Sequence, residues 1–169
     1  TGFGKTGSMF AAQTYGVTPD ILCCGKGLSS GMIPIGALIA REDMAEAFWG
    51  APQDNLQFAH GHTFAGNPLA CAVGLAVMDE VTAPGFLDQV SRASGRLRQG
   101  LEALVAAHPA VFGEVRGEGL MLGLKCVAPN TDVVKAGYDA RLLVVAAADN
   151  VVRELADRIE QGWPQRGQT

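Results

Sequence analysis

One lysine follows a strand-like run and differs in its surroundings from the other lysines of the chain. Residues 20–24 form a short apolar run that Gly25 ends, a pattern typical of a buried strand. Lys26 comes next, among small glycine and serine residues that leave room for a bulky partner beside the amine. An apolar strand end favours the neutral, nucleophilic amine, and α/β sheets bind ligands at such ends. The residues alone leave two interpretations open: a Schiff-base or phosphate-binding lysine, or an ordinary loop lysine.

A second candidate segment, residues 60–68, leads into a predicted helix start. Asn67 suits the N-cap, and Pro68 suits the first helical position, where its missing N–H costs nothing. The hydroxyl of Thr63 and the loop amides before this start form a natural anion site. His60 and His62 could bind a metal, but no third ligand lies at helical or strand spacing. We therefore expect a phosphate here and no metal.

The opening glycines match the spacing of a dinucleotide-binding loop, Gly2-x-Gly4-x-x-Gly7. That motif requires a strand before it, a helix after it and an acidic residue in a second strand. No strand is visible before Gly2, and the acidic residue is missing at the usual distance. A tight loop is the better interpretation, and a nucleotide-binding domain stays the rival one.

Strand and helix patterns alternate along the rest of the chain, which predicts an α/β fold with a boundary near residue 84. A four-residue apolar repeat at Val151, Leu155 and Ile159, with Glu154 placed to pair with Arg158, predicts a further helix after residue 150. The other predicted strands cover residues 33–40, 111–115, 120–126 and 142–146, and the other predicted helices residues 42–49, 68–83, 87–105 and 131–140.

Composition excludes several classes of function. Apolar residues make up 48% of the chain and charged residues 18%, as in a globular enzyme. A net charge of −4 gives no general attraction to nucleic acid or to anionic membranes, and no apolar run is long enough to span a bilayer. The four cysteines include no Cys-x-x-Cys pair, so we expect reduced thiols in a cytoplasmic protein.

Five segments together resemble the class III aminotransferases, which are pyridoxal-phosphate enzymes of fold type I. The resemblance implies that Lys26 holds pyridoxal 5′-phosphate as an internal aldimine. It also implies that Thr63 binds the cofactor phosphate of the partner subunit, in a homodimer with shared active sites. The segments occur in the family's order and spacing and are residues 1–7, 16–21, 26–31, 34–37 and 61–70.

The same resemblance implies a partial fold-type-I architecture. Residues 1–83 would be the C-terminal part of the large, mostly parallel-sheet domain that binds the cofactor. Residues 84–169 would be a small C-terminal α/β domain, truncated or altered after Arg153. The family's Asp for the pyridine nitrogen would precede Thr1, so we expect the chain alone, as a fragment, to be inactive. The rival of a different class is a non-catalytic fragment that serves only as a subunit-interaction module.

Two further segments, 115–123 and 148–153, resemble acetylornithine aminotransferases. This implies an acetylornithine-type amino donor, a 2-oxo acid acceptor and a place in arginine biosynthesis. Arg153 would then grip a substrate carboxylate, a bidentate task that suits guanidinium. In that subfamily the arginine precedes a strand, whereas the helical pattern after residue 150 indicates a strand lost here. Residues 32–34 and 62–64 instead resemble ω-amino-acid:pyruvate aminotransferases, which leaves that subfamily as the alternative.

Overall fold

The computed structural model describes residues 1–154 and divides the chain into two compact units. Unit 1 contains Thr1–Gly4 and Ser8–Leu87, and unit 2 contains Lys5–Gly7 together with the chain from Asp88 onward. The chain thus begins in unit 1, enters unit 2 at Lys5–Gly7 and then returns to unit 1. The assignment of the large and small domains to residues 1–83 and 84–169 stays a prediction.

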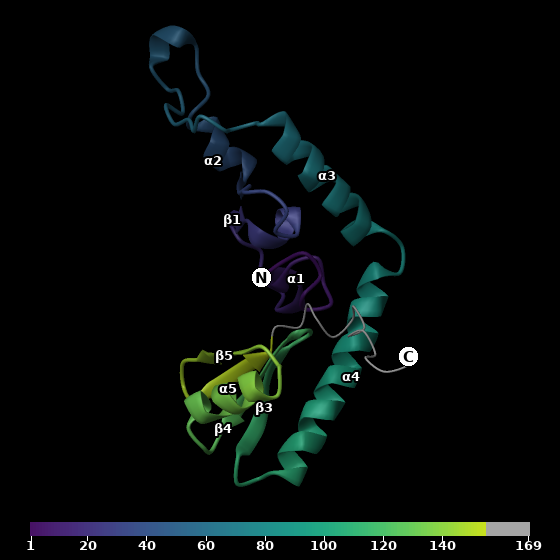
Figure 1. Cartoon of the computed structure of the whole chain (residues 1–169). Helices are drawn as coiled ribbons and strands as arrows, with labels where there is room; N and C mark the ends of the chain where they lie inside the picture. Colours follow the sequence, from purple (N-terminus) through teal and green to yellow (C-terminus); the bar gives the residue numbers. More distant parts are fainter. Residues whose placement is uncertain (155–169) are drawn as a thin grey trace. The chain divides into compact units, whose positions relative to one another are not determined.

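Unit 1 is built on a small hairpin and one long helix (Figure 1). Strand β1 (Ile21–Cys24) pairs antiparallel with β2 (Ala37–Ala40), from Ile21 opposite Ala40 to Cys24 opposite Ala37. Strand β2 is shorter than the predicted 33–40. Pro34 lies in the lost half, and proline lacks the N–H that a ladder requires. The remaining elements of unit 1 are α1 (Ala11–Thr14), η1 (Lys26–Ser29), α2 (Glu42–Glu46), η2 (Pro52–Asp54) and α3 (Pro68–Thr82).

Helix α3 begins where the sequence predicts. The side-chain oxygen of Asn67 accepts the N–H of Ala70 at 3.0 Å, and Pro68 is the first helical residue. Farther along, Gly74 lies beside η1, where a Cβ would make an ordinary van der Waals contact of 3.7 Å with the carbonyl oxygen of Leu28. The helix therefore supports the segment that begins with Lys26.

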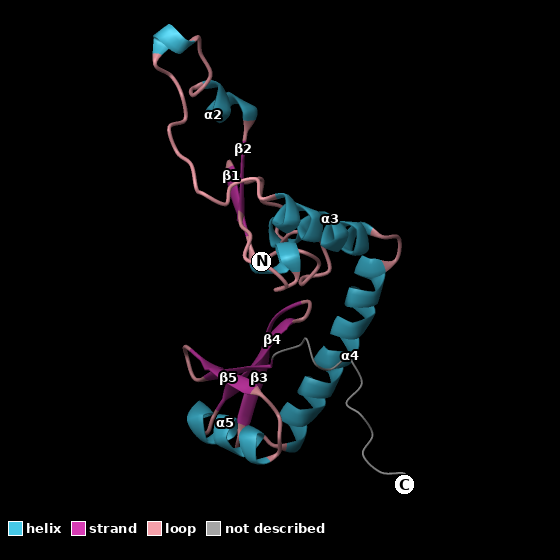
Figure 2. Cartoon of the chain, turned by 45° about the horizontal axis from the view of Figure 1, so that its top comes forward, coloured by secondary structure: helices cyan, strands magenta, loops and turns pink. Residues whose placement is uncertain are grey.

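Unit 2 is an antiparallel sheet covered by α5 (Asn130–Asp139) (Figure 2). Its strand order is β3-β4-β6-β5, and a small core forms around Cys126, Val144 and Val152. Helix α4 (Phe86–Ala107) leads into it, and Arg98 on this helix donates to the carbonyl oxygen of Gly117 at 2.6 Å. The strands are β3 (Phe112–Glu118), β4 (Met121–Cys126), β5 (Val144–Ala147) and β6 (Val151–Glu154).

The predicted helix after residue 150 is wrong for the residues that the structure describes. Residues Val151–Glu154 form β6, which lies between β4 and β5 and carries Arg153. The strand expected to be lost would follow Arg153, and that part of the chain lies outside the described residues. Val151 and Val152 are β-branched and favour a strand, and Val152 is 5% exposed in the sheet core. Backbone hydrogen bonding to β4 and β5 outweighs the helix preference of the four-residue apolar repeat. Leu155 and Ile159, which completed that repeat, lie outside the described residues.

Within residues 1–154 helices and strands are mixed, which agrees with the predicted α/β class. Within residues 1–154 every strand pairing is antiparallel, so the described part shows no parallel pair of a large sheet. Within the same residues no single helix is long and apolar enough to cross a membrane; only α3 and α4 taken together, as a broken pair, meet that criterion.

Candidate active site

Lys26 sits in a strained, glycine-flanked turn directly after β1. Its φ is +49°, in the left-handed region that a residue with a Cβ seldom occupies, and Gly25 before it is extended. The backbone carbonyl of Lys26 accepts the N–H of Gly31 at 3.3 Å, which closes the turn. Such strain costs on the order of 1–3 kcal/mol and persists only where the surroundings hold it in place.

Two contacts hold this turn from either side. A Cβ on Gly27 would come within 2.8 Å of the Phe3 ring, so only glycine fits beneath that ring without a shift. The Phe3 ring itself packs edge-to-face on Phe10, with centroids 5.6 Å apart. On the other side Ser29, 2% exposed, donates its hydroxyl to the carbonyl oxygen of Ile33 at 2.6 Å. The opening glycine segment thus works as a tight loop that supports η1.

The Lys26 side chain is exposed, and its amine has no ion pair or hydrogen bond to another residue within 1–154. The described residues therefore do not provide the apolar surroundings that the sequence suggests for it. What they provide is a fixed backbone and an amine that no carboxylate engages. An amine held in this way is open to a carbonyl-bearing partner.

Thr63 lies in the turn that leads into α3. The N–H of Ala65 donates to the carbonyl of His62 at 2.9 Å, and the N–H of Asn67 donates to the carbonyl of Phe64 at 3.1 Å. Thr63 is exposed beside a helix start, where orphan N–H groups favour anions. Thr63 and Lys26 share no hydrogen bond in the described part of unit 1.

Arg153 lies in unit 2, on β6, and not on a helix surface. It pairs with Gly123 of β4 on one side and Val145 of β5 on the other. Its Cγ lies 3.5 Å from where a Cβ on Gly123 would stand, so glycine leaves the arginine stem room to cross β4. Arg153 thus belongs to the central strand of the three strands β4, β6 and β5. Whether its guanidinium binds a substrate carboxylate stays a prediction.

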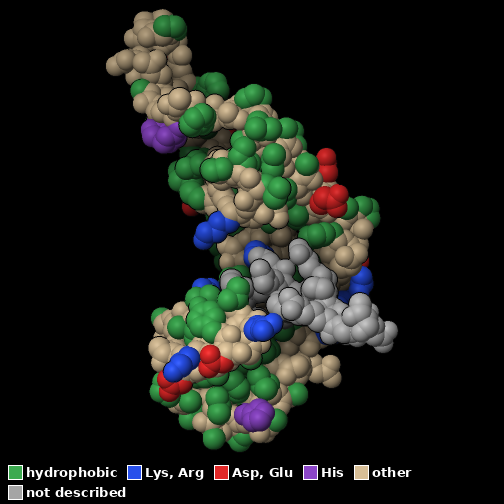
Figure 3. Space-filling view, in the orientation of Figure 1, with side chains coloured by type: hydrophobic (Ala, Val, Ile, Leu, Met, Phe, Trp, Pro, Cys, Tyr) green, Lys and Arg blue, Asp and Glu red, His purple; other side chains and the backbone are tan. Residues whose placement is uncertain are grey.

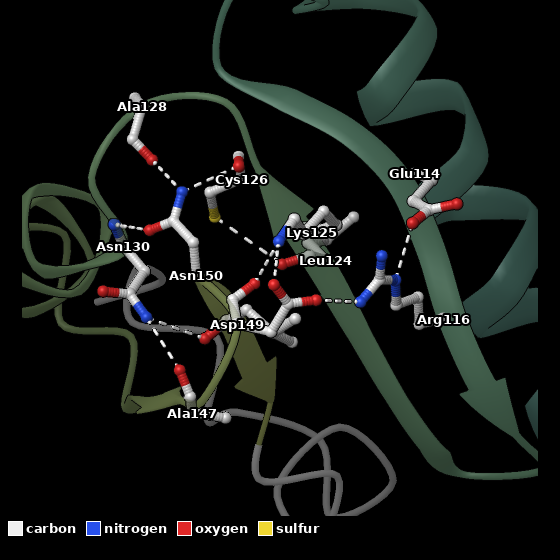
Figure 4. A network of polar contacts seen from close by, with 11 residues as sticks. Glu114, Arg116, Leu124, Lys125, Cys126, Ala128, Asn130, Ala147, Asp149 and Asn150 are labelled. Atoms are coloured by element: carbon white, nitrogen blue, oxygen red, sulfur yellow. Dashed lines mark hydrogen bonds and ion pairs between the residues drawn. The ribbon is translucent and has the colours of Figure 1, made fainter.

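A polar network that the sequence analysis did not predict fixes the turn before β6 (Figure 4). The amide nitrogen of Asn150 donates to the carbonyls of Cys126 at 2.8 Å and Ala128 at 2.9 Å, and its amide oxygen accepts the N–H of Asn130 at 2.8 Å. Asn130 in turn donates to the carbonyl of Ala147. Asp149 and Asn150 both have positive φ, 58° and 53°. The adjacent Asp-Asn pair was the available signal, since these residues tolerate this conformation.

Charges on the outer side of this turn form a linked row. Asp149 pairs with Lys125 at 2.6 Å and also with Arg116, which in turn binds Glu114 at 2.6 Å. Lys125 first and Arg116 second lower the pKa of the Asp149 carboxyl, while Asp149 first and Glu114 second raise the pKa of Arg116. Glu114, Arg116 and Asp149 are exposed and Lys125 is half-buried, so the pairs add little to stability and mainly orient the turn. Because the folded-state pKa of Asp149 is depressed, its contribution is present above the ordinary value of 3.8 and is lost as pH falls through the lowered value.

The Asn150 amide gives a stability prediction for unit 2. Asn150→Ala removes three hydrogen bonds and places alanine at positive φ, so we expect a loss of about 2–4 kcal/mol in the free energy of unfolding. Asn150→Gly is the matched variant, because it removes the same bonds without the backbone strain and should lose less. Urea unfolding with hydrogen exchange on β5 and β6 measures both. Equal losses in the two variants would contradict a strain contribution at this residue.

Comparison with known proteins places the chain among aminotransferases. The family model described as aminotransferase class-III matches residues 1–157. An acetylornithine aminotransferase of Rhodobacter capsulatus is 53% identical over 154 residues, which cover 91% of this chain and 37% of that protein. An acetylornithine aminotransferase of Brucella melitensis is 44% identical over 155 residues, covering 92% and 36%. The chain thus spans about 37% of the length of the curated relatives it matches.

Solved structures give the same result. The acetylornithine aminotransferase from Elizabethkingia anophelis aligns with a TM-score of 0.77 at 30% identity, over 91% of this chain and 39% of that one. An amine transaminase from an uncultivated Pseudomonas species, solved in the PLP-bound internal aldimine form, aligns with a TM-score of 0.79 at 32% identity, over 90% and 37%. An omega-aminotransferase from Paracoccus denitrificans aligns with a TM-score of 0.80 at 29% identity, over 89% and 36%.

Proposed function

Because the chain belongs to the class III aminotransferase family, we propose that the protein moves an amino group between an acetylornithine-type donor and a 2-oxo acid, with pyridoxal 5′-phosphate held on Lys26. The observation that carries the proposal is the 53% identity to an acetylornithine aminotransferase over 91% of the chain. It is supported by the unpaired amine of Lys26 on a fixed turn after β1. A place in arginine biosynthesis in the cytoplasm follows from that donor.

The residues of unit 1 fit this cofactor in two respects. A lysine amine free of carboxylates, next to small glycine and serine residues, suits a bulky aldehyde. A threonine before a helix N-terminus suits a phosphate. When bound, the cofactor supplies the electron sink for the substrate's Cα. The remaining tasks belong to the chain: Lys26 holds the cofactor and moves a proton at the substrate's Cα, and Thr63 anchors a phosphate.

We place Thr63 at the cofactor of a partner subunit, in a homodimer with shared sites. Arg153 is the proposed grip on a substrate carboxylate, because guanidinium binds carboxylates bidentately. Its support on β6, between β4 and β5, favours this role over that of a helix-surface charge.

The proposed function is tested with the complete, cofactor-loaded enzyme and two donors, because residues 1–169 alone are expected to be inactive. We expect kcat/KM with N-acetylornithine and 2-oxoglutarate to exceed kcat/KM with β-alanine and pyruvate. The second candidate is an ω-amino-acid:pyruvate aminotransferase, favoured by the TM-score of 0.80 to an omega-aminotransferase. The reverse preference would establish that candidate. Turnover with neither pair would support the non-catalytic alternative.

Thr63→Ala tests the phosphate site. We expect cofactor affinity to fall by about 1–3 kcal/mol, the scale for losing a hydrogen bond to a charged group. Equilibrium dialysis of pyridoxal phosphate measures the change. Thr82→Ala is the control, because the Thr82 hydroxyl bonds only the carbonyl of Met78 at the other end of the same helix. Affinity unchanged in both variants would show that other residues hold the phosphate.

A further inference from the structure

The Phe3 ring lies against the glycine that follows Lys26, and the backbone of Phe3 is itself unusual. Phe3 has a φ of +59°, a left-handed conformation that a bulky residue rarely adopts. Lys26, with a φ of +49°, has the same rare conformation. The two segments are in direct contact through the Phe3 ring and Gly27. Backbone of this kind persists only where the surrounding structure determines it, and it clusters at functional sites.

The opening segment of the chain holds Phe3 in place. The N–H of Ala11 donates to the carbonyl of Thr1 at 2.9 Å, which closes a loop around Phe3. Gly2 and Phe10 form an antiparallel bridge across this loop. A Cβ on Gly2 would lie 2.7 Å from the Phe10 ring, so glycine lets that ring lie against the backbone. The closed loop therefore fixes Phe10, whose ring in turn meets the Phe3 ring edge-to-face.

The Phe3 side chain is packed, unlike many other apolar side chains of the chain. Hydrophobic side chains lie at the surface of the face that Figure 3 shows, and the rings of Phe48, Phe58 and Phe64 are 49–79% exposed. Phe3 is half-buried. A Cβ on Gly27 would lie 2.8 Å from Cδ2 of Phe3 and 3.2 Å from both its Cβ and its Cγ. The whole base of the ring thus lies against the turn that begins with Lys26.

We propose that Phe3 is a positioning residue for transamination: its ring on Gly27 holds the turn, so that the Lys26 amine approaches the reacting carbon from one direction. The inference rests on the proposed function, in which Lys26 moves a proton of the substrate. The Lys26 amine has no partner within residues 1–154, so its backbone fixes where the side chain starts. A misplacement of about 1 Å by a residue away from the chemistry can lower a rate about hundredfold. Loss of the Phe3 ring should therefore slow the proton transfer and leave substrate binding in place.

Phe3→Ala in the complete, cofactor-loaded enzyme tests this role. We expect kcat per bound cofactor to fall about tenfold to hundredfold, with KM within about twofold, because the lost interaction acts on the transition state. Phe112→Ala is the matched control. It removes a ring that is partly buried against the core of unit 2, and it should leave kcat per bound cofactor and KM unchanged.

Gly27→Ala tests the same contact from the other side without removing a ring. Its Cβ would displace the Phe3 ring, so kcat should fall as in Phe3→Ala. In the double variant Phe3→Ala/Gly27→Ala the clash with the ring is gone, so the double variant should be no slower than the slower single variant. Losses that multiply in the double variant would contradict a shared contact.

A readout other than activity separates positioning from loss of folded protein. The visible absorbance of the cofactor on Lys26 is followed against pH. Moving the Lys26 nitrogen changes its distances to neighbouring charges, so the pH midpoint should shift by about half a unit or more in Phe3→Ala. A loss of folded protein would lower the amplitude and leave the midpoint in place, and that result would overturn the inference. Wild-type kcat in Phe3→Ala would overturn it too, whereas a wild-type enzyme without turnover on either donor pair would overturn the proposed function.

Discussion

Replacing Lys26 with alanine is expected to lower the kcat of transamination by at least 10²–10⁴, the usual contribution of a positioned acid–base group. The amine both holds the cofactor and moves the proton at the substrate's Cα, so its loss removes two tasks at once. The fold should survive, because the Lys26 side chain is exposed and makes no hydrogen bond or ion pair within the described residues. Steady-state kinetics on cofactor-saturated protein measures the loss.

Lys135→Ala is the matched control for this variant. Lys135 is exposed on α5 in unit 2, so its removal should leave kcat unchanged. Lys125 is unsuitable, because it pairs with Asp149. Borohydride reduction followed by peptide mapping should place the cofactor label on Lys26. A label on Lys5, Lys125 or Lys135 would refute the assignment, as would a Lys26→Ala variant with wild-type turnover.

Local signals in the sequence were sufficient for some elements. Asn67 and Pro68 fixed the start of α3, because a cap and a proline at the first helical position act within one turn. The apolar run before Gly25 likewise predicted the position of β1, although Ile21 and Cys23 are exposed and the strand is not buried within the described residues. At the candidate site, the sequence identified Lys26 by its small neighbours, and the structure adds the left-handed turn that holds it. The start of α3 and the position of β1 were predictable because in both the cause lies next to its effect in the chain, whereas the role of Lys26 stays a prediction.

Long-range pairing explains what the sequence missed. The repeat at Val151, Leu155 and Ile159 is compatible with a helix, but β4 and β5 provide backbone partners on both sides of Val151–Glu154. Neither partner is visible in a local window. The same holds for Asn150, whose partners Cys126 and Ala128 lie more than twenty residues earlier. The sequence shows that His60 and His62 are two residues apart, but the distance between their ring nitrogens depends on the fold of the loop.

The end of β3, just before the β3–β4 turn, contains the glycine whose replacement should most damage the fold. Gly117 has φ +107°, a region that residues with a Cβ rarely occupy. A Cβ there would lie 2.0 Å from the carbonyl oxygen of Met121, which is backbone and cannot swing away. The carbonyl oxygen of Gly117 also accepts a hydrogen bond from the guanidinium of Arg98. A shift at this position would therefore weaken the contact between α4 and the sheet. The strand pairing from Gly117 opposite Leu122 to Glu118 opposite Met121 would have to open.

We therefore expect Gly117→Ala to lower the free energy of unfolding of unit 2 by about 3–5 kcal/mol, the sum of backbone strain and a steric clash. Gly100→Ala is the control with the same chemical change. It lies exposed within α4, and a Cβ there meets no atom within 4 Å, so helix propensity should make it about 0.5–1 kcal/mol more stable. Urea unfolding at constant m-value compares the two, with hydrogen exchange on β3 and β4 to locate the loss. If the free energy of unfolding falls in Gly117→Ala and rises in Gly100→Ala, the local backbone geometry sets the requirement for glycine at residue 117. A Gly117→Ala protein as stable as the wild type would mean that the turn relaxes without cost and that the close approach to Met121 is not required by the fold.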